Sequence, residues 1–222
     1  MAIKRGKDLF AVGHLSLGYL FARGSARLLS KKVNIPLILT LSVLPDVDIL
    51  LKQLGIEHRG PTHSIIVLSI AFIPFFIIYR KEVIPYFIAI IQHSLVGDLI
   101  AGGSVRLLWP ATIQFNGIGI EITSQTNVML EWFIFLISMF VMLKTNDIKE
   151  FFQPQLSNLL LSVPAFTVLL PTVVSFPLVV PLLLEPPHFV YMFLFFAAAI
   201  IALYALFKGG FRLKIVGKQG AL

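Results

Sequence analysis

The run HFVYMFLFFAAAIIALYALF, residues 188–207, decides the class of fold. It contains no Asp, Glu, Lys or Arg, and about 20 apolar residues in a helix are enough to cross the hydrocarbon core of a bilayer. The whole chain of 222 residues is 57% hydrophobic and only 13% charged. A soluble domain has roughly a quarter of its residues charged. The sequence therefore predicts an integral membrane protein.

Further apolar segments extend this pattern along the chain. Residues 64–79 and 83–101 are predicted to span, and residues 127–143 are just long enough. Residues 156–184 carry four prolines, which predicts one kinked span or a span followed by a re-entrant stretch. The shorter segments 9–23 and 35–44 are expected to pack against the spans as helices.

Turn signals set one region apart from the helices. Asn116-Gly117 lies inside residues 114–122, which are predicted to form a small β-hairpin at the membrane surface. The expected fold is thus all-α, a multi-pass transmembrane helical bundle with a small surface β-hairpin. We expect residues 1–145 to form a membrane-embedded core that carries the functional site. Residues 146–222 would add transmembrane helices and a basic tail.

Charge and cysteine content narrow the possible partners. The net charge of +7 is spread between apolar segments, so we expect anionic lipids and topology to explain it, and no nucleic-acid partner. If the spans alternate, most basic residues share one end, which the positive-inside rule makes cytoplasmic together with the C-terminus. The expected location is a prokaryotic-type cell membrane. The absence of cysteine excludes disulfides and thiolate zinc sites.

Short polar clusters interrupt the apolar segments. They are Gly13-His14, Pro45-Asp46-Val47-Asp48, His58-Arg59-Gly60-Pro61-Thr62-His63-Ser64 and Gln92-His93-Ser94-Leu95-Val96-Gly97-Asp98. Polar groups at membrane depth are costly unless they are paired, coordinated or in a wet cavity. Imidazoles and carboxylates without thiols suit a divalent cation, and zinc fits the mixture best. The predicted topology brings Asp46, Asp48, His63 and Asp98 to the same, non-cytoplasmic end.

Spacing within the clusters supports convergence. Gly60-Pro61 rules out a continuous helix between His58 and His63, so both imidazoles can face one point, with Thr62 as the expected N-cap of the next span. His93 and Asp98 are five residues apart, and a π-bulge at Gly97 would align them.

Each cluster also has a simpler interpretation, which stays open. The two histidines of residues 58–63 could cap and hydrogen-bond locally, and Asp46 and Asp48 could form a helix-stop turn. His93 and Asp98 could form a buried pair, and His14 could be a satisfied buried histidine. Outside the clusters, Glu131 is expected as a ligand, a general base or an interfacial glutamate. Arg59 and Arg106 are expected to clamp a phosphate or to lie at the headgroups.

Together these motifs resemble the YdjM-like family of membrane-bound, metal-dependent hydrolases. The resemblance rests on Gly13-His14, Leu44-Pro45-Asp46-Val47-Asp48, residues 58–64, His93 with Asp98, and Leu107-Leu108-Trp109-Pro110. In the family a His stands four residues before the Asp, whereas here Ser94 holds that position. The order of His, Asp and Glu is similar, more distantly, to zinc-dependent phospholipase C.

We therefore expect a membrane-bound phosphoesterase that acts on a lipid or lipid-linked substrate with one or two divalent ions. The expected ligands are His14, Asp46, Asp48, His58, His63, His93 and Asp98. Asp98 or Glu131 would take the proton, and Arg59 and Arg106 would stabilise the phosphoryl oxygens. Two alternatives remain: a transporter that handles protons or cations, and a non-catalytic scaffold stabilised by metal.

Overall fold

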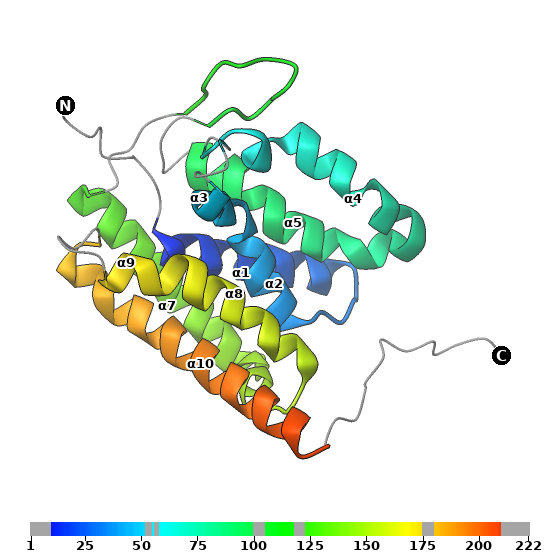
Figure 1. The fold of residues 1–222 in the computed structure, drawn as a ribbon, viewed down its shortest axis with the longest axis vertical. Coiled ribbons are helices and arrows are strands. Elements are labelled where there is room, and N and C mark those ends of the chain that lie inside the picture. Colours follow the sequence, from blue (N-terminus) through cyan, green and yellow to red (C-terminus); the bar gives the residue numbers. More distant parts are fainter. Residues whose placement is uncertain are drawn as a thin grey trace.

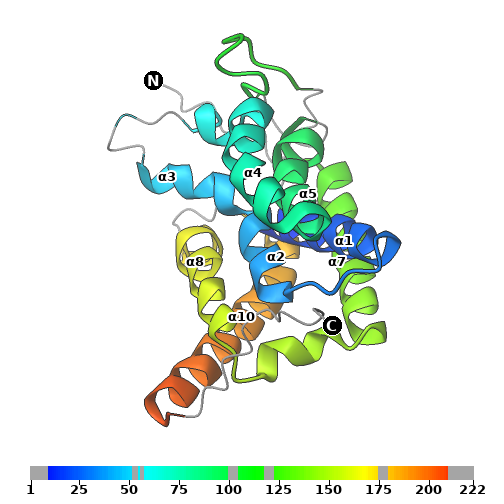
Figure 2. The same ribbon diagram turned by 90° about the vertical axis from the view of Figure 1, so that its right-hand side faces the viewer.

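The computed structural model describes residues 10–51, 55, 58–99, 105–117, 123–174 and 180–209. These residues are mostly helical, and they form three layers (Figure 1). Helices α1 (Ala11–Leu28) and α2 (Ile35–Ser42) lie in the middle, between the α4–α5 pair and α10, as the turned view also shows (Figure 2). The all-α class is confirmed.

Helix α1 is the centre of the core. Leu15, Tyr19, Ala22 and Ala26 are fully buried on it. Gly18 lies so close to α2 that a Cβ at this position would overlap the side chain of Ser42. The helix can therefore approach its neighbour only because a glycine stands at the crossing.

The hydrophobic core joins the two predicted parts of the chain. It includes Leu15 and Leu39 from the N-terminal part together with Leu161 and Phe195 from the C-terminal part. Burial of apolar side chains is the main favourable term in folding. The C-terminal helices thus stabilise the layer that carries several of the polar clusters.

Three helical stretches are long and apolar enough to cross a membrane, among the residues described. They are α7 (Gln125–Lys144), the combined stretch Leu156–Val174, and Leu182–Phe207, which contains η9 (Leu182–Leu184) and α10 (Glu185–Phe207). The predicted spans 127–143 and 188–207 fall inside two of them. Exposed side chains such as Phe133, Phe193 and Ile200 give these helices apolar outer faces.

The proline-rich segment changes helix type repeatedly. It begins as the 3₁₀ helix η7 (Leu156–Leu161) and continues through α8 (Ser162–Pro164), the π-helix η8 (Ala165–Leu169) and α9 (Leu170–Val174). Proline lacks an amide hydrogen, and its ring clashes with the preceding turn of a regular α-helix. The stretch is long and apolar enough for the predicted span, and the choice between a kinked span and a span with a re-entrant end stays a prediction. Its continuation through residues 175–179 lies outside the described residues.

Helices α4 (Ile65–Tyr79) and α5 (Ile84–Gln92) form an antiparallel pair joined by η4 (Arg80–Val83). The π-helix η5 (His93–Asp98) continues α5. Helix α4, with 15 residues, is shorter than the three long stretches, and the end of the predicted span 83–101 lies outside the described residues.

The N-cap of α4 differs from the prediction. Ser64, not Thr62, accepts hydrogen bonds from the amides of Ile66 and Val67. Thr62 lies inside the 3₁₀ turn η3 (Pro61–His63), because Pro61 starts that turn before the helix begins. The prediction of Thr62 as the cap was wrong.

The predicted surface β-hairpin is not supported. Residues 114–117 are extended but form no strand, and residues 118–122 lie outside the described part of the chain. The β-pairing among the described residues is one isolated antiparallel bridge between Val105 and Asn116. This bridge closes a loop of residues 105–117 and leaves Asn116 at its base, where the sequence pattern had placed a tight turn.

Candidate metal centre

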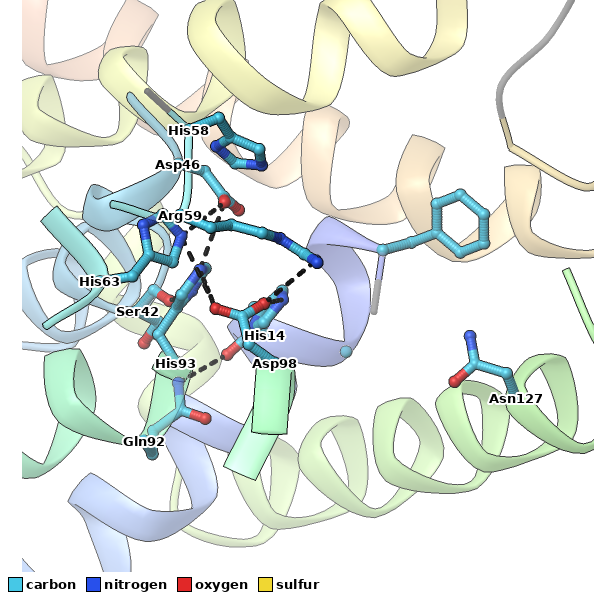
Figure 3. A network of polar contacts seen from close by, with 12 residues as sticks. His14, Ser42, Asp46, His58, Arg59, His63, Gln92, His93, Asp98 and Asn127 are labelled. Carbon is cyan, nitrogen blue, oxygen red and sulfur yellow. Dashed lines mark hydrogen bonds and ion pairs between the residues drawn. The ribbon is translucent and has the colours of Figure 1, made fainter. Parts of the chain in front are cut away.

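Residues from distant parts of the chain meet in one polar cluster (Figure 3). His14 lies in the first turns of α1, and Asp46 lies in the 3₁₀ turn η1 (Leu44–Val47) that follows α2. His63 ends η3, and both His93 and Asp98 come from η5. The convergence expected from the sequence is present in the fold.

The π-helix η5 gives His93 and Asp98 a common direction. Its six residues are the segment in which a π-bulge was predicted, and residues five apart align in a π-turn. The Nε2 atom of His93 lies 3.7 Å from Oδ2 of Asp98. The spacing that is awkward for a regular α-helix is therefore accommodated by the backbone.

Asp46 and Asp98 both lie close to the same two imidazoles, those of His63 and His93. Oδ1 of Asp46 is 3.4 Å from Nε2 of His63 and 3.3 Å from Nε2 of His93. Oδ2 of Asp98 is 3.6 Å from the same atom of His63. These distances exceed ordinary hydrogen-bond lengths. The nitrogen and oxygen atoms are therefore near one another without forming good hydrogen bonds.

Several of these atoms are buried without a hydrogen-bond partner: Nδ1 of His14, Nε2 of His63, Nε2 of His93 and Oδ2 of Asp98. A buried polar atom with no partner is costly, and native proteins rarely leave one unsatisfied. Such unpartnered atoms fit a divalent cation, which accepts lone pairs from imidazole nitrogen and carboxylate oxygen alike.

Three overlapping groups of ligand atoms could each hold an ion. They are His14–Asp46–His93, Asp46–His58–His63 and His63–His93–Asp98, and within each group the ligand atoms lie within 4.8 Å of one another. Asp46, His63 and His93 each belong to two groups. Six of the seven predicted ligands are therefore brought together, and shared members leave room for one ion or two.

Neighbouring groups fix which ring nitrogen is available. Nδ1 of His93 lies 2.8 Å from the carbonyl oxygen of Ser42, so this nitrogen carries the hydrogen and Nε2 keeps its lone pair. Nδ1 of His63 lies 3.0 Å from Oγ1 of Thr62. The Ser42 contact uses a backbone carbonyl, which has no signature in the sequence.

Asp48, the seventh predicted ligand, is not part of the three ligand groups and contacts the Nδ1 atoms of His58 and His63. Its carboxylate is 2.6 Å from Nδ1 of His58, and it accepts hydrogen bonds from the hydroxyl of Thr62 and the amide of Arg59. Burial alone would raise the pKa of Asp48, but the hydrogen bonds from His58, His63 and Thr62 hold that pKa well below its usual value. The geometry fits a carboxylate that orients imidazoles.

The same contact affects His58. Burial alone would lower the pKa of this imidazole, but the hydrogen bond and charge of Asp48 raise it above the usual value. His58 is the most exposed of the imidazoles in the cluster, with 29% of its side chain accessible. It therefore lies at the edge of the cluster that faces solvent.

Close packing places His14 against His93. The two rings are stacked, with centroids 3.8 Å apart and planes 19° apart. A Cβ at Gly97 would overlap the ring of His14. The glycine in η5 thus serves the bend of the helix and also makes space for a ring from α1.

Glu131 does not join the three ligand groups. Its buried carboxylate accepts hydrogen bonds from the backbone amides of Phe10, at 2.7 Å, and Gly13, at 3.1 Å. Asn127, one turn earlier on α7, donates to the same carboxylate and lies apart from the cluster (Figure 3). Glu131 therefore binds backbone amides at the start of α1, the helix that carries His14.

The two predicted arginines occupy different surroundings. Arg59 has a left-handed backbone with φ of 65°, and its largely buried guanidinium lies 3.5 Å from Oδ1 of Asp98. The guanidinium of Arg106 lies over the ring of Phe115, with 4.7 Å to its centroid. Their backbones are paired, because the Arg106 amide donates to the Arg59 carbonyl. Arg59 is thus the arginine that faces the cluster.

Comparison with known proteins gives one match. The family model described as YdjM inner membrane protein matches residues 10–211 of this chain. No curated protein matches, and no solved structure matches. Since the match covers most of the chain, the protein belongs to the YdjM inner membrane protein family, and it is a membrane protein.

Proposed function

We propose that this YdjM-family membrane protein is a metal-dependent hydrolase that acts on a phosphoester of a lipid or lipid-linked substrate. The observation that carries the proposal is the three overlapping groups of imidazole and carboxylate atoms, each compact enough to hold an ion, with Arg59 beside them. Zinc is the proposed metal, because it accepts both nitrogen and oxygen ligands.

The proposed ligands are His14, Asp46, His58, His63, His93 and Asp98, in sets that accommodate one ion or two. A divalent cation at such a site lowers the pKa of a bound water to about 7 and polarises a phosphoryl oxygen. Asp48 would orient His58, and Ser42 would hold His93 in the tautomer that leaves Nε2 free.

Three residues would act on the substrate side. Asp98 has a buried oxygen without a hydrogen-bond partner, which supports it as the group that accepts a proton from the attacking water. The contacts of Glu131 with α1 favour Asp98 over Glu131 for this role. Arg59 carries a fixed positive charge beside Asp98, and it would stabilise the negative charge that develops on phosphoryl oxygens. Arg106 would assist from the adjacent loop.

The proposed orientation follows from charge. Basic residues such as Arg80, Lys81, Lys144 and Lys208 occur at the ends of helices opposite to those that lead into the cluster. By the positive-inside rule these ends would be cytoplasmic, together with the C-terminus. The metal centre would then face the non-cytoplasmic side.

The test is hydrolysis of phosphoester substrates by the purified full-length protein. We expect release of phosphate that a chelator abolishes and added zinc restores, and we expect Asp46→Asn to abolish it. Asp147→Asn is the matched control, because Asp147 pairs with Arg23 outside the cluster. Equal rates for the original chain and Asp46→Asn would contradict the enzyme proposal. Bound metal without any hydrolysis would favour a scaffold.

A further inference from the structure

The loop of residues 105–117 stands out from the helical bundle beside the start of α4 (Figure 1). Two backbone hydrogen bonds between Val105 and Asn116, each 2.9 Å long, close its base. The loop is thus a defined element, and its tip extends away from the core.

The composition of this loop is unusual for a segment exposed to water. Residues 107–117 contain no charged side chain. Leu108, Ile113 and Phe115 are 40%, 72% and 47% exposed. Apolar groups gathered on an exposed loop mark a surface that contacts a membrane or another protein, and Trp109 is a residue type typical of the membrane interface.

An arginine lies at the base of this apolar tip. Arg106 places its guanidinium over the ring of Phe115. An arginine beside exposed apolar groups suits the boundary between acyl chains and phosphate headgroups, because the stem packs on the apolar side while the charge meets phosphate.

The loop is attached to the segment that carries His58 and His63. The Ile65 amide donates to the carbonyl of Leu107 at 3.0 Å, and the hydroxyl of Ser64 donates to the carbonyl of Trp109. The Arg106 amide donates to the Arg59 carbonyl at 3.1 Å. The depth of this loop in a bilayer would therefore fix the depth of the candidate metal centre.

We propose that the 105–117 loop inserts Leu108, Ile113 and Phe115 into the edge of the lipid bilayer and so sets the metal centre at the level of the headgroups. The bilayer is the occupant that fits, since α4, whose first amide is hydrogen-bonded to the loop, presents exposed apolar side chains at Ile70 and Ile73. Resting on the proposed function, we further infer that the substrate is a lipid that enters from the bilayer.

Spin labelling tests the insertion without reference to activity. The chain has no cysteine, so Ile113→Cys gives a single labelling site in the full-length protein. In vesicles of phosphatidylcholine and phosphatidylglycerol, we expect the label to collide more with oxygen, which enters lipid, than with a water-soluble nickel complex. Lys32→Cys, an exposed site at the end of α1 away from the loop, should show the reverse.

Two results would overturn the insertion. A nickel accessibility at position 113 equal to that at position 32 would place the loop in water. Spin–spin broadening between labels at position 113 would show that a second copy of the chain covers the loop. Either result would be independent of whether the protein hydrolyses anything.

A kinetic comparison tests the consequence for the substrate. We expect Ile113→Asp to lower hydrolysis of a phospholipid in vesicles by about tenfold, since a charge opposes insertion into the interface, and to leave hydrolysis of a water-soluble phosphoester unchanged. Equal losses with both substrates would contradict entry from the bilayer. If the original chain hydrolyses neither substrate, the proposed function fails. The spin-label measurements then still show whether the loop inserts into the bilayer.

Discussion

At the scale of single residues, the candidate centre depends on how closely two helices approach. His14 stacks on His93, and the absence of a side chain at Gly97 provides the space for its ring. We predict that Gly97→Ala displaces the ring of His14 and weakens zinc binding by about 10- to 100-fold, the range seen when groups that support ligands are changed. Competition with a fluorescent zinc chelator would measure the affinity.

The control for this substitution is Gly24→Ala. Gly24 lies on α1, and a Cβ there would meet nothing within 4 Å. Alanine in an exposed helical position is favourable by up to about 1 kcal/mol relative to glycine, so zinc affinity should stay unchanged. A Gly97→Ala protein with the original affinity would show that the position of His14 does not matter for binding.

Asp48 provides a second prediction at this scale. Its carboxylate hydrogen-bonds to His58 and Thr62 and accepts the amide of Arg59. We expect Asp48→Asn to weaken zinc binding by about tenfold without removing it, because the residue orients ligands and is not placed as one. Loss of all bound metal would instead identify Asp48 as a direct ligand.

At the scale of helices, Glu131 connects α7 to the start of α1. The N-cap residue Phe10 makes no side-chain capping hydrogen bond, and the Glu131 carboxylate accepts hydrogen bonds from the amides of Phe10 and Gly13. Loss of a buried hydrogen-bonding partner costs about 1–3 kcal/mol. We predict that Glu131→Leu lowers the free energy of unfolding by that amount, measured by denaturation in detergent.

The matched control is Glu82→Leu. Glu82 pairs with Lys31 on the surface, where an ion pair contributes about 0–1 kcal/mol. Zinc affinity separates the two interpretations of Glu131. If Glu131→Leu binds no metal while its fold is intact, the carboxylate is a ligand and the capping role is insufficient.

Local sequence patterns predicted the features that depend on a single helix. The apolar run 188–207 lies within α10, and the five-residue spacing of His93 and Asp98 predicted the π-turn that the structure contains. The role of Glu131 could not be predicted in this way, because its partners are about 120 residues away in sequence. The prediction of the α4 N-cap was wrong for a local reason, because Pro61 starts a separate 3₁₀ turn before the helix.

At the scale of the whole molecule, the apolar helices and the distribution of charge predict one orientation. Thr123 lies before α7, and Lys208 follows α10; both are exposed. In intact cells we expect a membrane-impermeant thiol reagent to label Thr123→Cys but not Lys208→Cys, because the positive-inside rule places the basic ends in the cytoplasm. Labelling should become equal once the cells are opened. The opposite pattern in intact cells would invert the proposed topology.

The convergence of distant clusters was the part of the site that sequence could indicate. Residue types and predicted helix ends placed imidazoles and carboxylates at one end, and the structure brings six of them into overlapping groups. The contact of Ser42 with His93 and the space that Gly97 leaves for His14 were not accessible from sequence, since they depend on a carbonyl direction and on the close approach of helices.

Metal content is the measurement closest to the central claim. Elemental analysis of the full-length protein, purified in detergent, should give one or two equivalents of zinc or a similar divalent ion per chain. We expect a double variant, Asp46→Asn with His63→Ala, to lose this metal, and Asp147→Asn to keep it. A folded original chain without bound metal after incubation with zinc would contradict the account, as would a double variant with the full metal content.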